Sequence, residues 1–246
     1  MATKEKPTIV ILHGWALTGD TFLPLVEALT KRGYRAISLD FPGFGSAELP
    51  KKPWGLADYA DWLRDWLQKQ NIKKPVLFGH SFGGRVSLKF QQIYPDKVTA
   101  LVLSGTPGYT PASRWAMMVG FIFSKIGGAF FSLPPFRLVE DRARLLWYRL
   151  IGAKDYLRPQ KVMRETFKKI VTEDLVASMK SVRCPCLLLW GEGDRMVRVG
   201  IARRMTPTIP GSKLIVVADA RHGVAFKKPE ETAKIISQFI QNDAAA

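Results

Sequence analysis

The chain has 246 residues, of which 47% are hydrophobic and 24% are charged. This composition excludes a disordered chain and allows a sizeable hydrophobic core. The formal net charge of +16 admits an acidic protein, an anionic lipid surface or a nucleic acid as a partner. No basic run with interleaved aromatic residues is present, so we expect no nucleic-acid partner.

The chain starts with a charged segment, "MATKEKP", followed by the short apolar run "TIVIL". This run is too short for the apolar region of a signal peptide and is typical of a buried strand. We therefore expect no signal peptide and a cytoplasmic location.

Short apolar runs alternate with helical patterns along most of the chain. Strands, with the loops that follow some of them, are predicted in residues 8–14, 35–45, 74–80, 98–106, 184–194 and 212–219. Helices are predicted in residues 21–33, 56–71, 82–95, 199–205 and 229–240. Nearly continuous apolar strands separated by helices are typical of a parallel sheet covered on both faces. The sequence therefore predicts an α/β fold with a mostly parallel sheet of about six strands.

The segment 107–182 interrupts this alternation, because it carries helical patterns and no strand signal. We expect residues 1–106 and 183–246 to form the core and residues 107–182 to form a helical lid, inserted after the fourth strand. A transmembrane helix is not expected, since Lys125 and the pairs Gly127–Gly128 and Pro134–Pro135 interrupt the apolar part. Contact with a membrane interface stays open as an alternative.

Several large apolar side chains are expected to line a substrate pocket beneath the lid. They are Trp115, Met118, Phe121 and Val197. Apolar residues at helical spacing are explained equally well by core packing, so this pattern alone does not identify a substrate.

The two cysteines, Cys184 and Cys186, are too close in sequence for an easy disulfide. No second Cys or His cluster could complete a zinc site, so we expect two small apolar side chains entering a buried strand. No metal and no cofactor are expected.

The pentapeptide Gly79-His80-Ser81-Phe82-Gly83 matches the pattern G-x-S-x-G, between a predicted strand and a predicted helix. In this context the serine occupies a tight strand-to-helix turn, and the flanking glycines allow neighbouring backbone to approach closely. The helix N-terminus directs N–H groups toward the reacting centre and favours a developing oxyanion. We predict that Ser81 is a nucleophile.

A serine hydroxyl needs a general base to accept its proton, and the chain has three histidines. The sharp turn directs the side chain of His80 away from the serine, and His13 is expected to orient the loop after the first strand. His222 follows the last strand, at the edge where ligands bind in open α/β sheets. We predict that His222 is the general base.

The third catalytic group should be a carboxylate that orients the imidazole and stabilises its cation. Asp194 follows the penultimate strand in a Gly-rich loop. With Asp194 as the acid, the order along the chain is nucleophile, acid and base, which is typical of this pattern. Glu192 and, less strongly, Asp219 are alternatives, and Asp40 is expected to brace loops.

An oxyanion hole requires two backbone N–H donors. Phe82 should provide one donor, as the residue after the nucleophile, and Trp15 should provide the other from the loop after the first strand. Both roles belong to the backbone, so the two side chains would affect mainly the shape of the pocket.

Together these motifs resemble the α/β-hydrolase superfamily over nearly the whole chain, with the lid as the least similar part. They occur in the expected order: "LHGW", "LDFPGFGSA", "GHSFGG", "LLLWGEGD" and "DARHGVAFKKPEE". The usual early hairpin is missing, so residues 35–40 should form an edge strand. Arg221 stands where many relatives have Gly, and Lys227 where an acidic residue is common.

Within the superfamily, the chain resembles bacterial carboxylesterases, hydrolases of ring-cleavage products and pimeloyl-carrier-protein methyl ester esterases. The resemblance implies a serine carboxylic ester hydrolase that acts through an acyl-enzyme on short-to-medium acyl or aromatic esters. One alternative is a carrier-protein-dependent methyl esterase or thioesterase, since the segment 107–182 has thirteen Lys and Arg and six Asp and Glu, a net charge of +7. Another is a small-molecule binding protein that keeps the triad but turns over negligibly.

Overall fold

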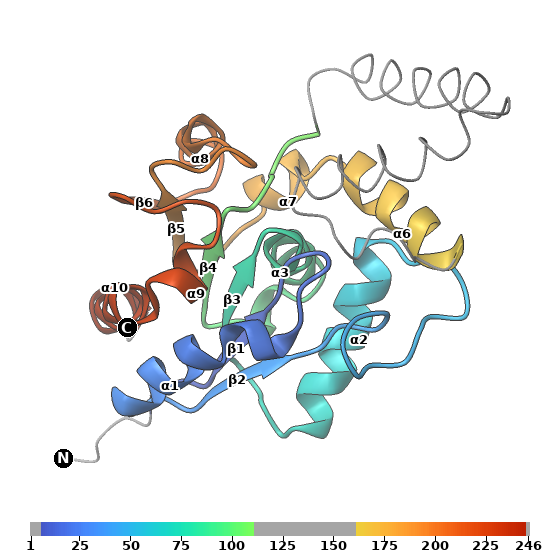
Figure 1. Ribbon diagram of the computed structural model, residues 1–246, viewed down its shortest axis with the longest axis horizontal. Helices are drawn as coiled ribbons and strands as arrows, with labels where there is room; N and C mark the ends of the chain where they lie inside the picture. Colours follow the sequence, from blue (N-terminus) through green and yellow to red (C-terminus); the bar gives the residue numbers. More distant parts are fainter. Residues whose placement is uncertain (1–5, 111–160, 245–246) are drawn as a thin grey trace, which may run out of the picture.

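The computed structural model describes residues 6–110 and 161–244. Its centre is a six-stranded sheet with the order β2-β1-β3-β4-β5-β6, in which every neighbouring pair is parallel (Figure 1). The strands are β1 (Ile9–Leu12), β2 (Ala36–Leu39), β3 (Val76–His80), β4 (Ala100–Ser104), β5 (Cys186–Gly191) and β6 (Lys213–Val217). The predicted α/β fold is thus confirmed, and β2 is the edge strand that the missing hairpin implied.

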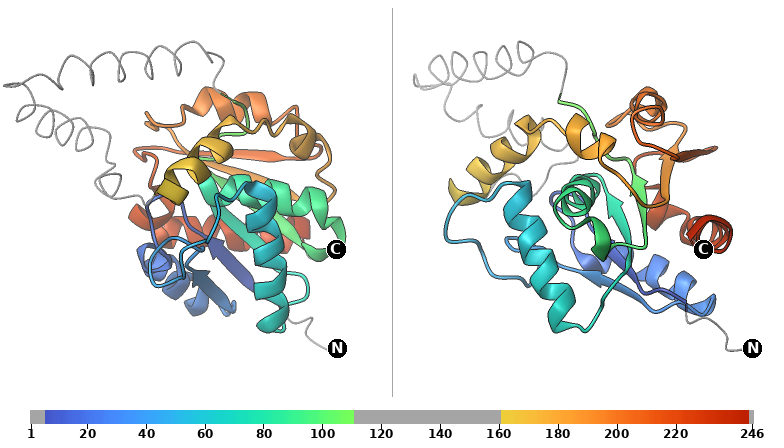
Figure 2. Two further views of the ribbon diagram at one scale, coloured as in Figure 1. Left: turned by 90° about the vertical axis from the view of Figure 1, so that its right-hand side faces the viewer. Right: turned by 180° about the vertical axis from the view of Figure 1, so that it is seen from behind.

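Helices cover both faces of the sheet (Figure 2). One face packs against α2 (Leu56–Lys69), α3 (Phe82–Ile93), α6 (Lys161–Thr172), α7 (Val176–Lys180) and α8 (Val199–Met205). The other face packs against η1 (Gly19–Phe22), α1 (Leu23–Lys31), α9 (Val224–Lys227) and α10 (Pro229–Phe239). Two short elements, η2 (Pro95–Lys97) and η4 (Ile240–Ala244), complete the described part. The four inner strands, β1, β3, β4 and β5, are nearly continuous apolar runs because both of their faces are buried, whereas the edge strands β2 and β6 are partly exposed.

The segment between β4 and β5 contributes only helices to the described structure, α6 and α7. Both fall inside the range 107–182 that the sequence marked as a lid, whereas residues 111–160 lie outside the described residues. In the part of the chain that the structure describes, no helix has the length and apolar character needed to cross a membrane.

The two cysteines are free thiols at the start of β5, with Cys186 buried and Cys184 half-buried. Burial raises the pKa of Cys184 to about 11, so its thiol stays protonated at neutral pH. They therefore act as the small apolar side chains predicted from the sequence.

Close contact between α3 and the end of β4 depends on Gly84. A Cβ atom at this position would overlap the Thr106 side chain. We predict that Gly84→Ala lowers the free energy of unfolding by about 1–3 kcal/mol through overpacking. The control is Gly200→Ala on α8, where nothing lies within 4 Å of the new Cβ; it should raise this free energy by up to about 1 kcal/mol. Urea denaturation measures both, and shifts of the same sign would contradict the prediction.

Candidate active site

The predicted nucleophile, Ser81, lies in a strained turn between β3 and α3. Its backbone has φ 51° and ψ −107°, a conformation that costs a non-glycine residue about 1–3 kcal/mol. The Ser81 N–H donates to the Ser104 carbonyl at 2.8 Å, which ties the turn to the end of β4. A side chain at Gly83 would overlap the carbonyl of Leu12. The glycine therefore allows α3 to start directly against β1.

The predicted base and acid form a direct hydrogen bond, with His222 Nδ1 2.8 Å from Asp194 Oδ2. The Asp194 side chain is fully buried, and its other oxygen accepts the backbone N–H groups of Met196 and Val197 at 2.9 Å each. Because a carboxylate only accepts hydrogen bonds, Nδ1 carries a proton, and in the neutral imidazole Nε2 therefore keeps its lone pair. This arrangement prepares Nε2 to accept a proton from a hydroxyl.

The end of β4 contacts both halves of the predicted triad. Ser104 accepts the Ser81 N–H, and the next residue, Gly105, has φ 56°. A Cβ atom at Gly105 would lie 2.8 Å from Cε1 of His222 and 3.5 Å from Oδ2 of Asp194. The dipeptide Ser104–Gly105 therefore brings the loops of Ser81, Asp194 and His222 together at the carboxyl edge of the sheet.

The alternative carboxylates occupy other positions. Glu192 and Asp219 are exposed, whereas Asp194 holds the imidazole. Asp40 accepts hydrogen bonds from the backbone N–H groups of Gly19, at 2.7 Å, and Ser46, at 3.0 Å. Asp40 therefore braces two loops, as the sequence predicted.

The other two histidines are buried and belong to the surroundings of the site. His13 Nε2 accepts the Phe41 N–H at 3.0 Å, so its Nδ1 donates to the Gly14 carbonyl at 2.7 Å and orients the loop after β1. The ring of His80 lies 4.7 Å from that of His222, centroid to centroid. Burial lowers the pKa of His13, and burial followed by repulsion from His222 holds the pKa of His80 well below 6.5. Both rings are therefore neutral at pH 7.

These two neutral histidines predict a loss of stability in mild acid. Since their pKa values are lower in the folded state, the unfolded chain binds more protons as the pH falls below 6.5. Each should lower the free energy of unfolding by up to about 1.4 kcal/mol per pH unit. Urea denaturation between pH 7 and pH 5.5 measures the change of this free energy with pH. His80→Gln should reduce that change by up to about 1.4 kcal/mol per pH unit, which corresponds to one proton. A slope that the substitution leaves unchanged would contradict the assignment.

The side chains of the two residues predicted to supply the oxyanion donors pack together. Phe82 is the first residue of α3, so its backbone N–H has no acceptor within the helix. The rings of Trp15 and Phe82 are 5.6 Å apart, and Trp15 also packs against Phe44 at 4.8 Å and against Phe167 of α6 at 5.0 Å. These contacts fix the loop that carries Trp15 next to the N-terminus of α3.

The predicted pocket residues differ in what the structure says of them. Trp115, Met118 and Phe121 lie outside the described residues. Val197 is half-buried, and its backbone serves as a brace, because its N–H donates to Asp194 and its carbonyl accepts Trp190 Nε1 at 2.7 Å. A role of Val197 in binding substrate stays a prediction.

The sequence did not predict a role for two residues near the site, Arg85 and Phe167. Arg85 is 3% exposed, and burial lowers its pKa to about 10, which leaves it charged at pH 7. A charged residue four positions after Ser81, on the buried side of a helical pattern, was the available signal. No signal in the sequence paired Phe167 with Trp15. Among the residues that the structure describes, no group of three or more His, Cys, Asp and Glu could hold a metal ion.

Comparison with known proteins assigns the chain to a protein family. The family of the alpha/beta hydrolase fold matches residues 7–229, and the chain belongs to this family. The resemblance seen in the sequence motifs is confirmed at this level.

The chain is also similar to individual proteins in sequence and in fold. The chain is 27% identical over 246 residues to the pimeloyl-[acyl-carrier protein] methyl ester esterase of Nitrosomonas europaea, with 93% of this chain and 94% of that protein covered. It is 25% identical to the AB hydrolase superfamily protein YisY of Bacillus subtilis, with 94% and 90% covered. An esterase from Exiguobacterium antarcticum has the same fold, with a TM-score of 0.76 at 19% identity over 96% of this chain and 92% of that one.

Proposed function

We propose that the protein is a serine carboxylic ester hydrolase whose triad is Ser81, Asp194 and His222. The observation that carries this proposal is the 2.8 Å hydrogen bond between the buried Asp194 carboxylate and His222, at the sheet edge where Ser81 occupies its strained turn. The same proposal takes residues 1–106 and 183–246 as the catalytic core and residues 107–182 as a helical lid.

In the proposed reaction, Ser81 Oγ attacks the ester carbonyl carbon while His222 Nε2 accepts the hydroxyl proton. The negative charge moves to the carbonyl oxygen, where the backbone N–H groups of Trp15 and Phe82 stabilise it. His222 then donates the proton to the leaving alcohol, and an acyl-enzyme remains on Ser81. A water molecule, deprotonated by His222, attacks the acyl carbon; the bond to Ser81 Oγ then breaks, His222 returns the proton to Oγ, and the acid is released. Asp194 stabilises the imidazolium throughout.

A fluorophosphonate probe tests this proposal, because it reacts only with an activated serine. Folded protein should be labelled on the peptide that contains Ser81, and neither Ser81→Ala nor heat-denatured protein should be labelled there. Absence of labelling in the folded protein would support the alternative, a binding protein with negligible turnover.

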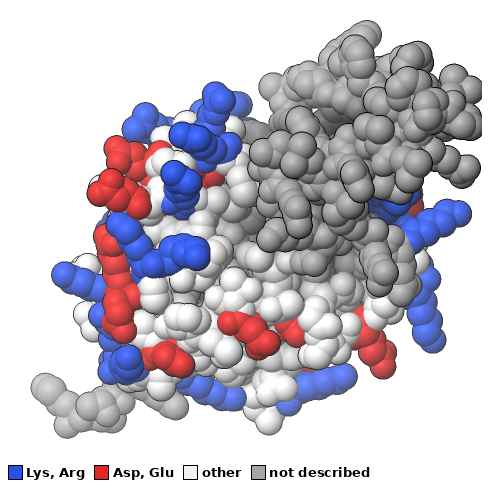
Figure 3. All heavy atoms as spheres, viewed as in Figure 1, with Lys and Arg blue, Asp and Glu red and all other residues white. Residues whose placement is uncertain are grey.

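A second candidate is an esterase for acyl groups bound to an acidic carrier protein. Two observations favour it: the relative from Nitrosomonas europaea carries such a name, and the chain has a net charge of +16. Figure 3 shows basic side chains at the upper left, where α8 lies in the view of Figure 1, with acidic side chains beside them. Carrier-bound methyl ester hydrolysis should weaken with added salt more than p-nitrophenyl butyrate hydrolysis. An equal salt dependence would contradict this candidate.

A further inference from the structure

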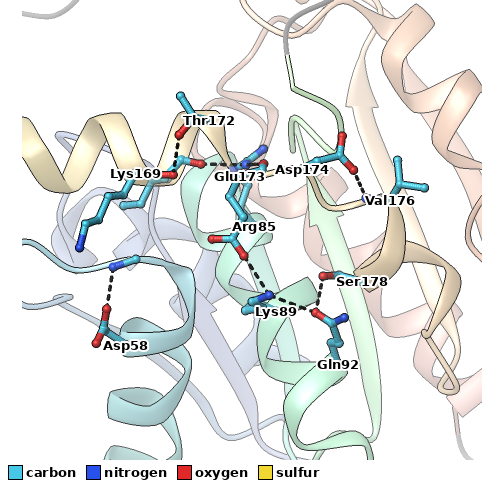
Figure 4. A network of polar contacts seen from close by, with 12 residues as sticks. Asp58, Arg85, Lys89, Gln92, Lys169, Thr172, Glu173, Asp174, Val176 and Ser178 are labelled. Atoms are coloured by element: carbon cyan, nitrogen blue, oxygen red, sulfur yellow. Dashed lines mark hydrogen bonds and ion pairs between the residues drawn. The ribbon is translucent and has the colours of Figure 1, made fainter.

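A single buried guanidinium, that of Arg85 on α3, holds three backbone carbonyls. Figure 4 shows Arg85 beside Glu173. Nη1 donates to the carbonyl of Pro107, and Nη2 donates to those of Ile170, at 2.8 Å, and Glu173. Pro107 follows β4, whereas Ile170 and Glu173 lie at the end of α6. Arg85 therefore joins the start of the segment between β4 and β5, and the end of α6 within it, to the helix that begins after Ser81.

The acceptors at the end of α6 explain why a cation occupies this position. The last carbonyls of a helix have no partner within the helix, and a positive charge is favourable at this end. Ile170 is in the last turn of α6, which ends at Thr172. Arg85 supplies both the donors and the charge in a place that is closed to water. Without them, the Ile170 carbonyl would lose its donor in a buried environment.

A second contact between α3 and this segment lies one turn further along the helix. Lys89 pairs with the carboxylate of Glu173 at 2.9 Å and reaches Gln92 at 3.2 Å, and Gln92 accepts the hydroxyl of Ser178 on α7 at 2.7 Å (Figure 4). Both side chains of the Lys89–Glu173 pair are partly exposed, so the pair should contribute little to stability. The buried contact of Arg85 is the stronger of the two.

α6 also contacts the loop that carries Trp15. Phe167 lies one turn before the carbonyls that Arg85 holds, and its ring packs 5.0 Å from the Trp15 ring. On the same helix, Thr166 Oγ1 accepts the backbone N–H of Trp54 at 3.0 Å. α6 therefore connects Arg85 on one side to the loop of the predicted oxyanion donor on the other.

We propose that Arg85 is a positioning residue for the reaction. By fixing the end of α6 to the helix that begins after Ser81, it holds Phe167 against Trp15 and keeps the oxyanion donors aligned with the nucleophile. This inference rests on the proposed ester hydrolysis at Ser81. A displacement of about 1 Å in such a donor is sufficient to lower a rate by about 100-fold.

The test compares Arg85→Met, which keeps an unbranched apolar stem but removes the guanidinium and its donors, with Arg85→Lys, which restores the charge and at least one donor. With p-nitrophenyl acetate, whose acyl group is too small to depend on an extended pocket, Arg85→Met should lower kcat by about 100-fold with a much smaller change in KM. Arg85→Lys should recover part of the loss. Lys89→Met, the matched control on the same helix, should keep kcat close to the parent value.

Amide hydrogen exchange provides a readout that does not depend on turnover. In Arg85→Met, exchange should become faster in residues 161–172 and around Trp15, while exchange in β3 stays as in the parent protein. A folded Arg85→Met with the kcat of the parent, or with uniformly faster exchange, would overturn the proposal. If Arg85→Met does not fold, Arg85→Lys replaces it in the test. Arg85→Lys must then show faster exchange in residues 161–172 and around Trp15 together with a lowered kcat, and a result without these two changes would also overturn the proposal. Were Ser81 shown to be unreactive, the proposed function would fall, and the exchange pattern would still report whether Arg85 holds α6.

Discussion

Ser81→Ala is expected to lower kcat for p-nitrophenyl butyrate by about 10⁶-fold, since the reaction would lose its nucleophile. The rate that remains would come from the oxyanion donors and from binding alone. The midpoint of thermal unfolding should stay nearly unchanged, because the Ser81 backbone contact to Ser104 does not involve the side chain. Steady-state kinetics and a melting curve measure the two quantities.

The control for this substitution is Ser87→Ala on the same helix. Ser87 is buried, and its hydroxyl donates to the Gly83 carbonyl at 2.9 Å. This variant removes a buried serine hydroxyl without touching the reacting groups, so its activity should remain close to that of the parent. Full activity of Ser81→Ala, or an equal loss in Ser87→Ala, would exclude the mechanism.

Asp194→Asn is expected to lower kcat by about 10⁴-fold while the loop keeps its shape. The amide oxygen can still accept the N–H groups of Met196 and Val197, which the carboxylate accepts at 2.9 Å. The amide nitrogen would then face His222 Nδ1, and it is a donor where the imidazole needs an acceptor. Nδ1 would lose its proton, Nε2 would carry it, and the ring could no longer accept the serine proton.

Glu192→Gln is the matched control for Asp194→Asn, because it neutralises an exposed carboxylate two residues earlier in the same loop. Its kcat should equal that of the parent. Nearly full activity in Asp194→Asn, together with a large loss in Glu192→Gln, would show that Glu192 is the catalytic acid instead. Circular dichroism of both variants confirms that the comparison is between folded proteins.

Most of the sheet could be predicted because its four inner strands are buried on both faces and therefore appear as continuous apolar runs. Runs such as "TIVIL" and "CLLLW" became β1 and β5, and the position of Ser81 between a strand and a helix was enough to predict its turn. The chain order of Asp194 and His222 identified a pair that the structure joins by a hydrogen bond.

The contacts of Arg85 could not be predicted, for a physical reason. Its acceptors are backbone carbonyls 22, 85 and 88 residues away, and a backbone carbonyl leaves no trace in residue identity. The packing of Phe167 on Trp15 joins helix α6 to the loop after β1 through shape alone. The bracing role of Val197 also belongs to its backbone, which is why its side chain suggested a pocket residue.

The packing of α1 against α10 has a consequence for how the chain folds as it is synthesised. These helices lie side by side on one face of the sheet, and Arg32, just after α1, pairs with Glu230 of α10 at 2.7 Å (Figure 1). A nascent chain that has already made all six strands still lacks two of the helices that cover this face, since α9 and α10 follow β6. Ile236 and Phe239 complete the cluster there. Apolar sheet surface therefore remains open to chaperones, or to other nascent chains, until the ribosome has released α10.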